Sequence, residues 1–315
     1  MGHFLKSKGR ILLLMGLTFS LSLGQMTYIE DEEKGILAIY EGPDQVLTYC
    51  FKDQLKRKAN PKQIRSCYIH PLYSLEGEIL TDDFPRDHPH HHGLFWTWPV
   101  VKTRGHQTQT WHPDEPSLRQ HFNRWLKRIE KNGTFVLGVE NHWKLNNKET
   151  VAKEILTLCI HPADKRGRAV DIKIVIESVG GRLELQGSPE QKKGYGGLCF
   201  RGAPDFQGSV LTTDQGNLKK DSTNKPFHWA DLSTEKHGVA VFVCPGHPDF
   251  PPTWLIRNSY AGILNVSWPG LKPAALNSGE PVTLSYRVYI HKGDVHRGRV
   301  KEAYQEYILT AKKNS

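Results

Sequence analysis

The alternation of apolar and polar residues predicts that strands make up most of this chain. Between residues 169 and 176 every second position is apolar, which is the period of a half-buried strand. Those positions are Val170, Ile172, Ile174 and Ile176. Nine runs of this general kind can be recognised. They are Ile36–Tyr40, Gln45–Phe51, Thr134–Trp143, Glu154–His161, Ala169–Ser178, Arg182–Gln186, Gly238–Cys244, Gly262–Trp268 and Val282–His291.

Turn residues separate these runs, and the pairs Asn132-Gly133 and Gly180-Gly181 suit tight connections between neighbouring strands. Only Arg297–Ala311 has apolar residues near helical spacing over an ordinary helix length. Many strands with one late helix indicate an all-β protein, an antiparallel β-sandwich. No linker divides residues 25–315, so we expect a single domain.

The first residues have the pattern of a secretory signal peptide. Three basic residues precede an apolar core at 11–23, and small residues before Gln25 suit cleavage there. The core is shorter than the roughly 20 apolar residues of a membrane span. We therefore expect a leader at residues 1–24 and a secreted or periplasmic mature protein without a membrane anchor.

The charge of the chain bears on its possible partners, and the cysteine content bears on disulfide bonds. The chain has 42 Lys and Arg against 33 Asp and Glu, and losing the three basic leader residues leaves 39 − 33 = +6. The basic residues are scattered and no nucleic-acid motif is present, so an anionic glycan suits the mature protein better than a nucleic acid. The five cysteines contain no Cys-x-x-Cys pair, which argues against a disulfide framework.

A cluster of histidines is the strongest chemical signal. The run DHPHHHG occupies Asp87–Gly93, a segment that we call the histidine block. Imidazole can move a proton near neutral pH, bind a metal or hydrogen-bond a sugar hydroxyl. His88 and His90 have the spacing of strand ligands for a divalent metal, but Pro89 between them favours a loop. We assign no metal or other cofactor and leave a metal at His88 and His90 as an alternative.

The histidine block and other segments resemble a secreted bacterial family of unknown function that is often labelled "methane oxygenase PmoA". The resemblance covers nearly the whole mature chain. It is carried by Arg65–Tyr73, Asp83–Pro85, the block through Pro99, Glu140–Trp143, Glu154, Asp171, Lys192–Pro204, Trp229–Asp231, Gly238–Ala240, His247–Trp254, Arg257, Trp268-Pro269 and Leu284–Asp294.

The resemblance implies a galactose-mutarotase-like β-supersandwich, a group whose members act on or bind carbohydrates. It implies nothing about methane, because a methane monooxygenase subunit is an integral membrane protein and this chain has no apolar span beyond its leader. Relatives have arginine where this chain has His92, which removes a possible anion ligand from that position.

We therefore expect a carbohydrate-active protein, and favour an enzyme of the epimerase, lyase or hydrolase kind that pairs histidine with a carboxylate for proton transfer. The alternatives are a glycan-binding protein without activity and a metal-dependent enzyme. The candidate catalytic residues are His88, His90, His91 and Glu154. The candidate substrate-binding residues are Asp87, Trp98, Glu190, Arg201, Trp254, Arg257 and His291.

One geometric expectation follows from this assignment. If the histidine block is functional, the remote residues Arg201, Glu154 and Arg257 should converge on it, with the tryptophans lining the wall. Other catalytic arrangements find less support, because the chain has no Gly-x-Ser-x-Gly elbow and no nucleotide-binding glycine loop.

Overall fold

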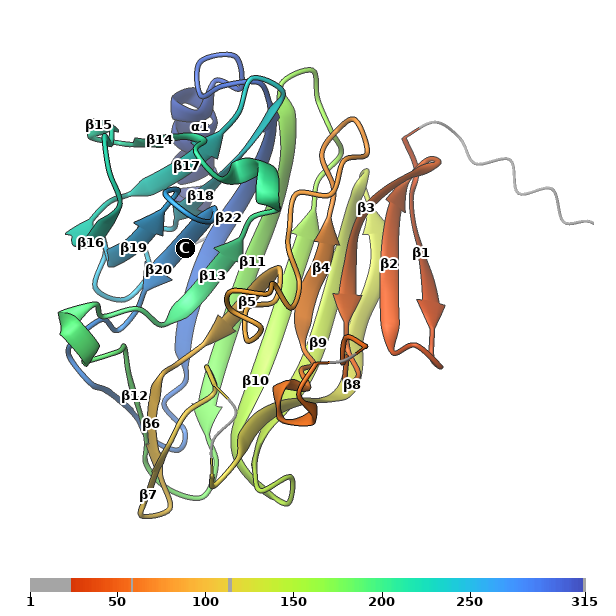
Figure 1. Cartoon of the computed structure of the whole chain (residues 1–315). Helices are drawn as coiled ribbons and strands as arrows, with labels where there is room; N and C mark the ends of the chain where they lie inside the picture. Colours follow the sequence, from red (N-terminus) through yellow and green to blue (C-terminus); the bar gives the residue numbers. More distant parts are fainter. Residues whose placement is uncertain (1–23, 58, 113–114, 314–315) are drawn as a thin grey trace, which may run out of the picture.

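The computed structural model describes residues 24–57, 59–112 and 115–313, and almost all of its regular structure is antiparallel strand (Figure 1). The first nine-stranded sheet has the order β1-β2-β3-β4-β5-β13-β20-β19-β16. Its strands are β1 (Met26–Asp31), β2 (Ile36–Glu41), β3 (Asp44–Cys50), β4 (Tyr68–Leu72), β5 (Leu94–Thr97), β13 (Gly197–Arg201), β20 (Ile263–Ser267), β19 (Thr253–Arg257) and β16 (Ser222–Pro226).

A second nine-stranded sheet has the order β15-β14-β17-β18-β22-β11-β10-β9-β8. Its strands are β15 (Gly216–Asn217), β14 (Val210–Thr213), β17 (Trp229–Ser233), β18 (His237–Val243), β22 (Val282–Lys292), β11 (Gly167–Ser178), β10 (Glu149–Ile160), β9 (Thr134–Leu145) and β8 (Leu118–Lys131).

The remaining elements are short, apart from one helix. A four-stranded sheet has the order β21-β12-β6-β7 and lies at the lower end of the view in Figure 1. It consists of β21 (Ala274–Leu276), β12 (Leu183–Gln186), β6 (Val100–Thr103) and β7 (His106–Thr108). The helices are the 3-10 turns η1 (Pro61–Gln63), η2 (Glu190–Lys192) and η3 (Pro204–Phe206), and α1 (Val300–Lys313).

The predicted all-β fold is confirmed, and each of the nine predicted strands overlaps an observed one. The late helix is also present, beginning at Val300 rather than Arg297. The tight turn at Asn132-Gly133 has positive φ at both residues, as a hairpin turn of this type requires. The sequence pattern missed the 14-residue β8, because this edge strand is mostly polar and largely exposed.

The two large sheets pack face to face around the main core, and alternation along each strand decides which side chains enter it. In β5, Leu94 and Trp96 belong to this core, whereas Phe95 between them joins a separate cluster on the opposite face. In β13 the core residues Leu198 and Phe200 alternate with Cys199 in the same way. The first sheet therefore has an outer face that points away from the second sheet.

The outer faces of the two sheets have different coverings. Helix α1 packs on the outer face of the second sheet, where Val300, Ala303 and Tyr307 meet Phe242 and Tyr289. Loops cover the outer face of the first sheet, including the histidine block in front of β5 and β13 (Figure 1). The candidate site lies under these loops.

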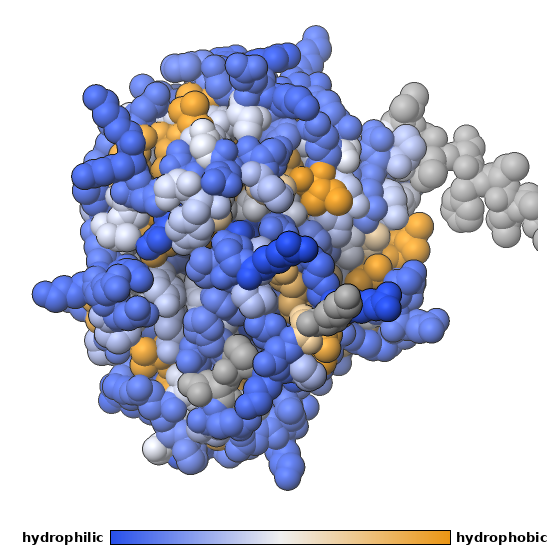
Figure 2. Space-filling view, viewed as in Figure 1, coloured by the Kyte–Doolittle hydropathy of each residue, from blue (hydrophilic) through white to orange (hydrophobic). Residues whose placement is uncertain are grey.

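The surface drawn in Figure 2 is mostly hydrophilic, with apolar side chains gathered only in small separate patches. Among the described residues, no helix is long and apolar enough to cross a membrane. All five cysteines are free, and three of them are buried. The predicted leader at 1–24 falls almost entirely outside the described residues.

Candidate functional site

The histidine block is held against the first sheet by backbone hydrogen bonds at its end. The Gly93 amide donates to the Asp82 carbonyl at 2.7 Å, and the Arg201 amide donates to the Gly93 carbonyl at 2.7 Å. Gly93 has φ of +52°, and a Cβ there would lie 2.3 Å from the Ile69 carbonyl oxygen. Only glycine tolerates both conditions, so Gly93 lets the loop return tightly into β5.

The buried Arg201 binds the carboxylate of Asp87, the first residue of the histidine block. Arg201, 5% exposed at the end of β13, donates from Nη2 to both Asp87 oxygens at 2.9 and 3.1 Å. Asp87 Oδ2 in turn lies 2.8 Å from His88 Nδ1. Burial acts to raise the pKa of Asp87, but the hydrogen bonds from His88 and Arg201 outweigh it and lower that pKa. An ionised Asp87 therefore accepts the Nδ1 proton of His88 and leaves Nε2 as the basic nitrogen.

Stacking fixes the orientation of the His88 ring. His88 stacks with both Tyr260 and His91, with ring centroids 5.6 and 4.9 Å away and interplanar angles of 21° and 15°. Arg201 Nη1 lies 3.4 Å from His91 Nδ1. Because a guanidinium can only donate, His91 accepts at Nδ1 and its proton is placed on Nε2.

Burial keeps the neighbouring imidazoles neutral. It lowers the pKa of His90 to about 3, and the nearby His112 acts in the same direction. The pKa of His91 is also well below its ordinary value, first because of burial and then because of His90. At neutral pH these rings can accept or donate hydrogen bonds, but they add no positive charge.

The histidine block borders a pocket of about 340 Å³, which we call the histidine pocket. This volume lies within the range of roughly 300–1,000 Å³ that is common for small-molecule sites. The pocket is lined by His88, His90, His91, Trp111, His112, Glu190, Lys193, Tyr195, Leu255, Arg257, Tyr260, Ile263 and Asn265. Aromatic walls beside charged and amide groups suit a sugar, which has an apolar face and a rim of hydroxyls.

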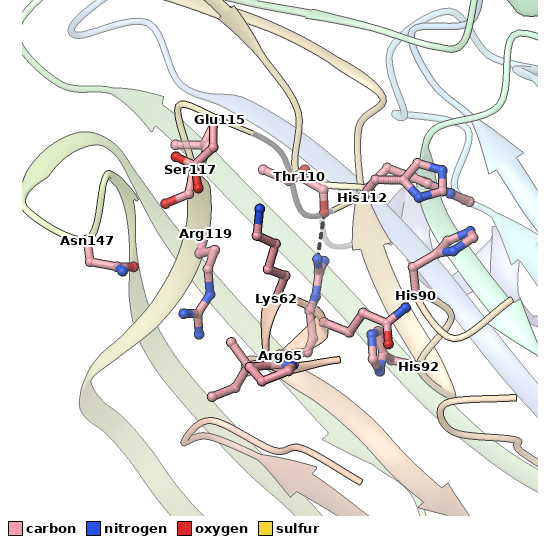
Figure 3. A pocket seen from close by; sticks show the side chains of 15 residues that line it. Lys62, Arg65, His90, His92, Thr110, His112, Glu115, Ser117, Arg119 and Asn147 are labelled. Atoms are coloured by element: carbon pink, nitrogen blue, oxygen red, sulfur yellow. Dashed lines mark hydrogen bonds between the residues drawn. The ribbon is translucent and has the colours of Figure 1, made fainter. Parts of the chain in front are cut away.

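A smaller pocket of about 180 Å³ adjoins it, and we call it the basic pocket (Figure 3). Both pockets are lined by His90, Trp111 and His112. The other labelled side chains in Figure 3 come from η1 and the segment after it, from the histidine block, from the loop between β7 and β8, from β8 and from the turn between β9 and β10. They are Lys62, Arg65, His92, Thr110, Glu115, Ser117, Arg119 and Asn147.

No group of three or more His, Cys, Asp or Glu side chains in the described part of the chain is arranged to hold a metal ion. The metal alternative at His88 and His90, whose rings are tilted by 71° to each other, stays a prediction, whereas the stacked pair His88 and His91 does not suit one shared ion. A metal lies in the plane of each imidazole that binds it, about 2.1 Å from the nitrogen, and two nearly parallel rings cannot both reach one ion.

The structure brings together seven of the candidate residues. His88, His90, His91, Glu190 and Arg257 line the histidine pocket. Asp87 and Arg201 are outside the pocket lining and form the hydrogen bonds that position His88. Of the three remote residues expected to converge, Arg201 contacts His91 and Arg257 lines the same pocket.

Glu154 does not join this pocket. It is fully buried on β10 between the two large sheets, where four neutral side chains donate to its carboxylate at 2.9–3.0 Å. The donors are Trp96 Nε1, Gln120 Nε2, Asn141 Nδ2 and Trp143 Nε1. This geometry fits a structural carboxylate that ties the sheets together.

The other three candidates also lie elsewhere. Trp98 and Trp254 are fully buried in the main core and donate to the carbonyls of Trp268 and Phe227, both at 2.8 Å. His291, on β22 of the second sheet, forms a buried pair with Asp231 at 2.7 Å. All three matched the family pattern, but a match does not distinguish a core residue from a binding residue.

Sequence reasoning missed six polar or aromatic residues of the histidine pocket. They are Trp111, His112, Lys193, Tyr195, Tyr260 and Asn265. Asn265 could have been found from its position in β20, where it alternates with the core residues Leu264 and Val266. The others lie on loops, whose positions have no periodic signal in the sequence.

Comparison with known proteins places the chain in a family. A family model described as a family of unknown function, DUF6807, matches residues 37–305. The chain belongs to DUF6807. A search of curated proteins finds no match to this DUF6807 sequence. The label "methane oxygenase PmoA" is not part of the family description and stays a prediction.

This DUF6807 chain is also similar, at low sequence identity, to solved structures of the galactose-mutarotase kind. A candidate mutarotase from Salmonella typhimurium is 9% identical with a TM-score of 0.40, and the match covers 85% of this chain and 90% of that one. A galactose mutarotase related enzyme from Lactobacillus acidophilus is 7% identical, with a TM-score of 0.38 and coverage of 85% and 97%. A GalM/aldose epimerase homologue from C. elegans is 9% identical, with a TM-score of 0.36 and coverage of 85% and 100%. These likenesses concern the fold alone.

Proposed function

We propose that this protein is a carbohydrate-active enzyme in which His88 exchanges a proton with a sugar bound in the histidine pocket. The observation that carries the proposal is the chain of contacts from Arg201 through Asp87 to His88. A buried guanidinium fixes the carboxylate, and the carboxylate fixes the tautomer and direction of the imidazole. Sugar binding alone does not require such control of one proton, whereas general base catalysis does.

The rest of the pocket supplies what proton transfer at a sugar needs. Among the described lining residues, Glu190 is the only carboxylate, and it is the candidate partner for His88 as acid or base. Arg257 presents a rigid donor fork that suits hydroxyl or carboxylate oxygens. Trp111, Tyr195 and Tyr260 offer aromatic faces for the C–H side of the ring.

Epimerase, lyase and hydrolase reactions share this requirement. In each, a base removes a proton from carbon, hydroxyl or water, and an acid delivers one to a ring, carbonyl or leaving-group oxygen. The pocket supports the shared step, and the identity of the products would distinguish the three reactions.

The test is a search for turnover with matched histidine variants. The purified protein is incubated in D₂O with a panel of aldoses, uronic acids and oligosaccharides, and proton NMR follows anomer exchange, deuterium incorporation and new reducing ends. We expect His88→Ala to lower the rate at least about 100-fold. His106→Ala, at an exposed position on β7, should leave it unchanged. Circular dichroism checks that both variants fold.

The rival function is glycan binding without catalysis. It predicts that a glycan array gives ligands for the wild type, that His88→Ala retains them, and that no bound glycan is converted to product. The metal-dependent alternative predicts a stoichiometric metal in protein purified without a tag, measured by elemental analysis. Export through the predicted leader also stays a proposal, to be checked by fractionation of the producing cells.

A further inference from the structure

The basic pocket carries an excess of positive charge beside the proposed sugar site. Among the described residues, its lining includes the cations Lys62, Arg65 and Arg119 and one carboxylate, Glu115. Arg119 also forms an ion pair with Asp53 outside the lining. Lys62 and Arg65 take part in no ion pair with another described residue. Figure 3 shows these cationic side chains around one hollow.

Arg65 is the unusual member of this group. Its Nη1 donates to the Thr110 carbonyl at 2.6 Å and its Nη2 to Gln120 Oε1 at 3.2 Å, so both partners are neutral. Its Nε is buried and has no hydrogen-bond partner in the described structure. Burial lowers the pKa of Arg65 to about 10. Both direct acceptors of this guanidinium are neutral, and the carboxylate of Glu154 is linked to it only through Gln120, so an anion in the pocket would stabilise it further.

The side chains of His90, Ser117 and Asn147 in the wall carry no charge at neutral pH. His90 is neutral at neutral pH, because burial lowers its pKa to about 3. Ser117 and Asn147 add uncharged groups on the far side of the pocket. The composition therefore suits an oxyanion, which would accept hydrogen bonds from guanidinium, ammonium and hydroxyl donors together.

We propose that the basic pocket is a second subsite, which binds the carboxylate or sulfate of an acidic glycan whose neighbouring sugar unit occupies the histidine pocket. This inference rests on the proposed function of the histidine pocket. The two pockets are lined on one side by the same residues, His90, Trp111 and His112, so adjacent units of one chain can fill both. The subsite would make the protein selective for acidic over neutral glycans.

The experiment compares acidic probes with neutral counterparts of the same length. The probes are a tetragalacturonide and its methyl ester, and a keratan sulfate tetrasaccharide, which has no uronic acid, and its neutral desulfated form. Affinities are measured by microscale thermophoresis at two salt concentrations. We expect the wild type to bind at least one acidic probe about tenfold more tightly than its neutral counterpart, with the preference shrinking at high salt. The preferred pair shows whether carboxylate or sulfate is recognised.

Lys62→Glu tests the pocket itself, because Lys62 is exposed and only its backbone amide forms a hydrogen bond, to Asn60. This variant should lose the preference for the acidic probe and keep the affinity for the neutral one. Lys219→Glu makes the same charge change at an exposed residue between β15 and β16 and should behave as the wild type. Replacing Arg65 would also disturb Thr110 and Gln120, so Lys62 is the cleaner site.

Three results would overturn the inference. Equal affinity of the wild type for acidic and neutral probes would leave the proposed function standing and remove the second subsite. Equal losses in Lys62→Glu and Lys219→Glu would show only a general charge effect. Failure of the wild type to bind any glycan, acidic or neutral, would overturn the proposed function and the subsite together.

Discussion

Two carboxylates in this molecule, the exposed Asp87 and the buried Glu154, have opposite settings. Asp87 contacts the cationic Arg201 and the ionisable His88 at the rim of a pocket. Glu154 is enclosed in the core by four neutral N–H donors. The first setting controls a proton that solvent or a ligand can reach, whereas the second satisfies donors that would otherwise be buried without partners. Substitutions at the two residues should therefore have different effects.

Asp87→Asn should lower turnover without greatly changing substrate affinity. The asparagine amide can donate to His88 Nδ1, which would place the imidazole proton on Nε2 and remove the base from the pocket. We expect kcat to fall about 100-fold or more, with a small change in KM and an altered pH profile. Asp214→Asn is the matched control, because Asp214 holds the exposed His228 through the same kind of contact, at 2.6 Å. A large rise in KM at unchanged kcat would contradict the positioning role.

Glu154→Gln should destabilise the fold. The glutamine oxygen would stay where Trp96, Trp143 and Gln120 donate, and its N–H₂ group would face the Asn141 Nδ2 donor, which leaves buried donors opposed and without an acceptor. We expect the free energy of unfolding to fall by about 2–4 kcal/mol, measured by urea denaturation. Glu280→Gln, at an exposed site, should change it by less than about 0.5 kcal/mol. Lost activity at unchanged stability would instead place Glu154 in the reaction.

The histidine block is an element whose stability depends on pH. Burial lowers the folded-state pKa of His90 to about 3, below the unfolded value near 6.5. Between these values the unfolded state binds more protons, so the stability present above pH 6.5 is lost as the pH falls toward 3. His91 acts in the same direction. Each such histidine contributes a slope of up to about 1.4 kcal/mol per pH unit.

His90→Phe should therefore reduce the acid lability. Urea denaturation at pH 7, 6, 5 and 4 should show a shallower loss of unfolding free energy in this variant than in the wild type. His106→Phe replaces an exposed histidine and should retain the wild-type slope. Parallel curves for the wild type and His90→Phe would mean that protonation of His90 does not cause the loss of stability at low pH.

At the scale of elements, periodicity predicted nine of the 22 strands in the described part of the chain, among them four of the five longest. The core strand β11 alternates strictly and was assigned within two residues of its ends. The edge strand β8 has charged and polar residues along most of its length, so its partner β9 rather than its own pattern determines it. Short strands such as β5, with four consecutive buried residues, show no alternation from which a face could be assigned.

The candidate site was most directly predictable where its residues are close in sequence. The histidine block was visible because its chemistry lies within seven residues. Arg201 and Glu154 both looked functional from their family match, but one faces the loop-covered side of the first sheet and the other the core. The register of each strand and the packing of the two sheets determine which face of a strand is buried in the core. Neither can be read from the matching motifs alone.

For the whole molecule, the two large sheets separate the candidate site from the helix. The histidine pocket lies on the outer face of the first sheet, and α1 covers the outer face of the second. The main core fills the space between them. The C-terminal helix should therefore act on global stability and not on the geometry of the pocket.

Ala303→Glu tests this separation. Ala303 is buried where α1 meets Phe242 and Tyr289, and a glutamate there would lie among apolar and aromatic side chains. We expect the free energy of unfolding to fall by about 3 kcal/mol, because the new charge is buried without a partner. Gln305→Glu creates the same residue at an exposed helix position and should leave stability nearly unchanged. Glycan affinity is measured below the lowered melting temperature, and the histidine pocket of both variants should bind as tightly as that of the wild type. A loss of affinity in Ala303→Glu alone would show that the helix and the pocket are coupled through the core.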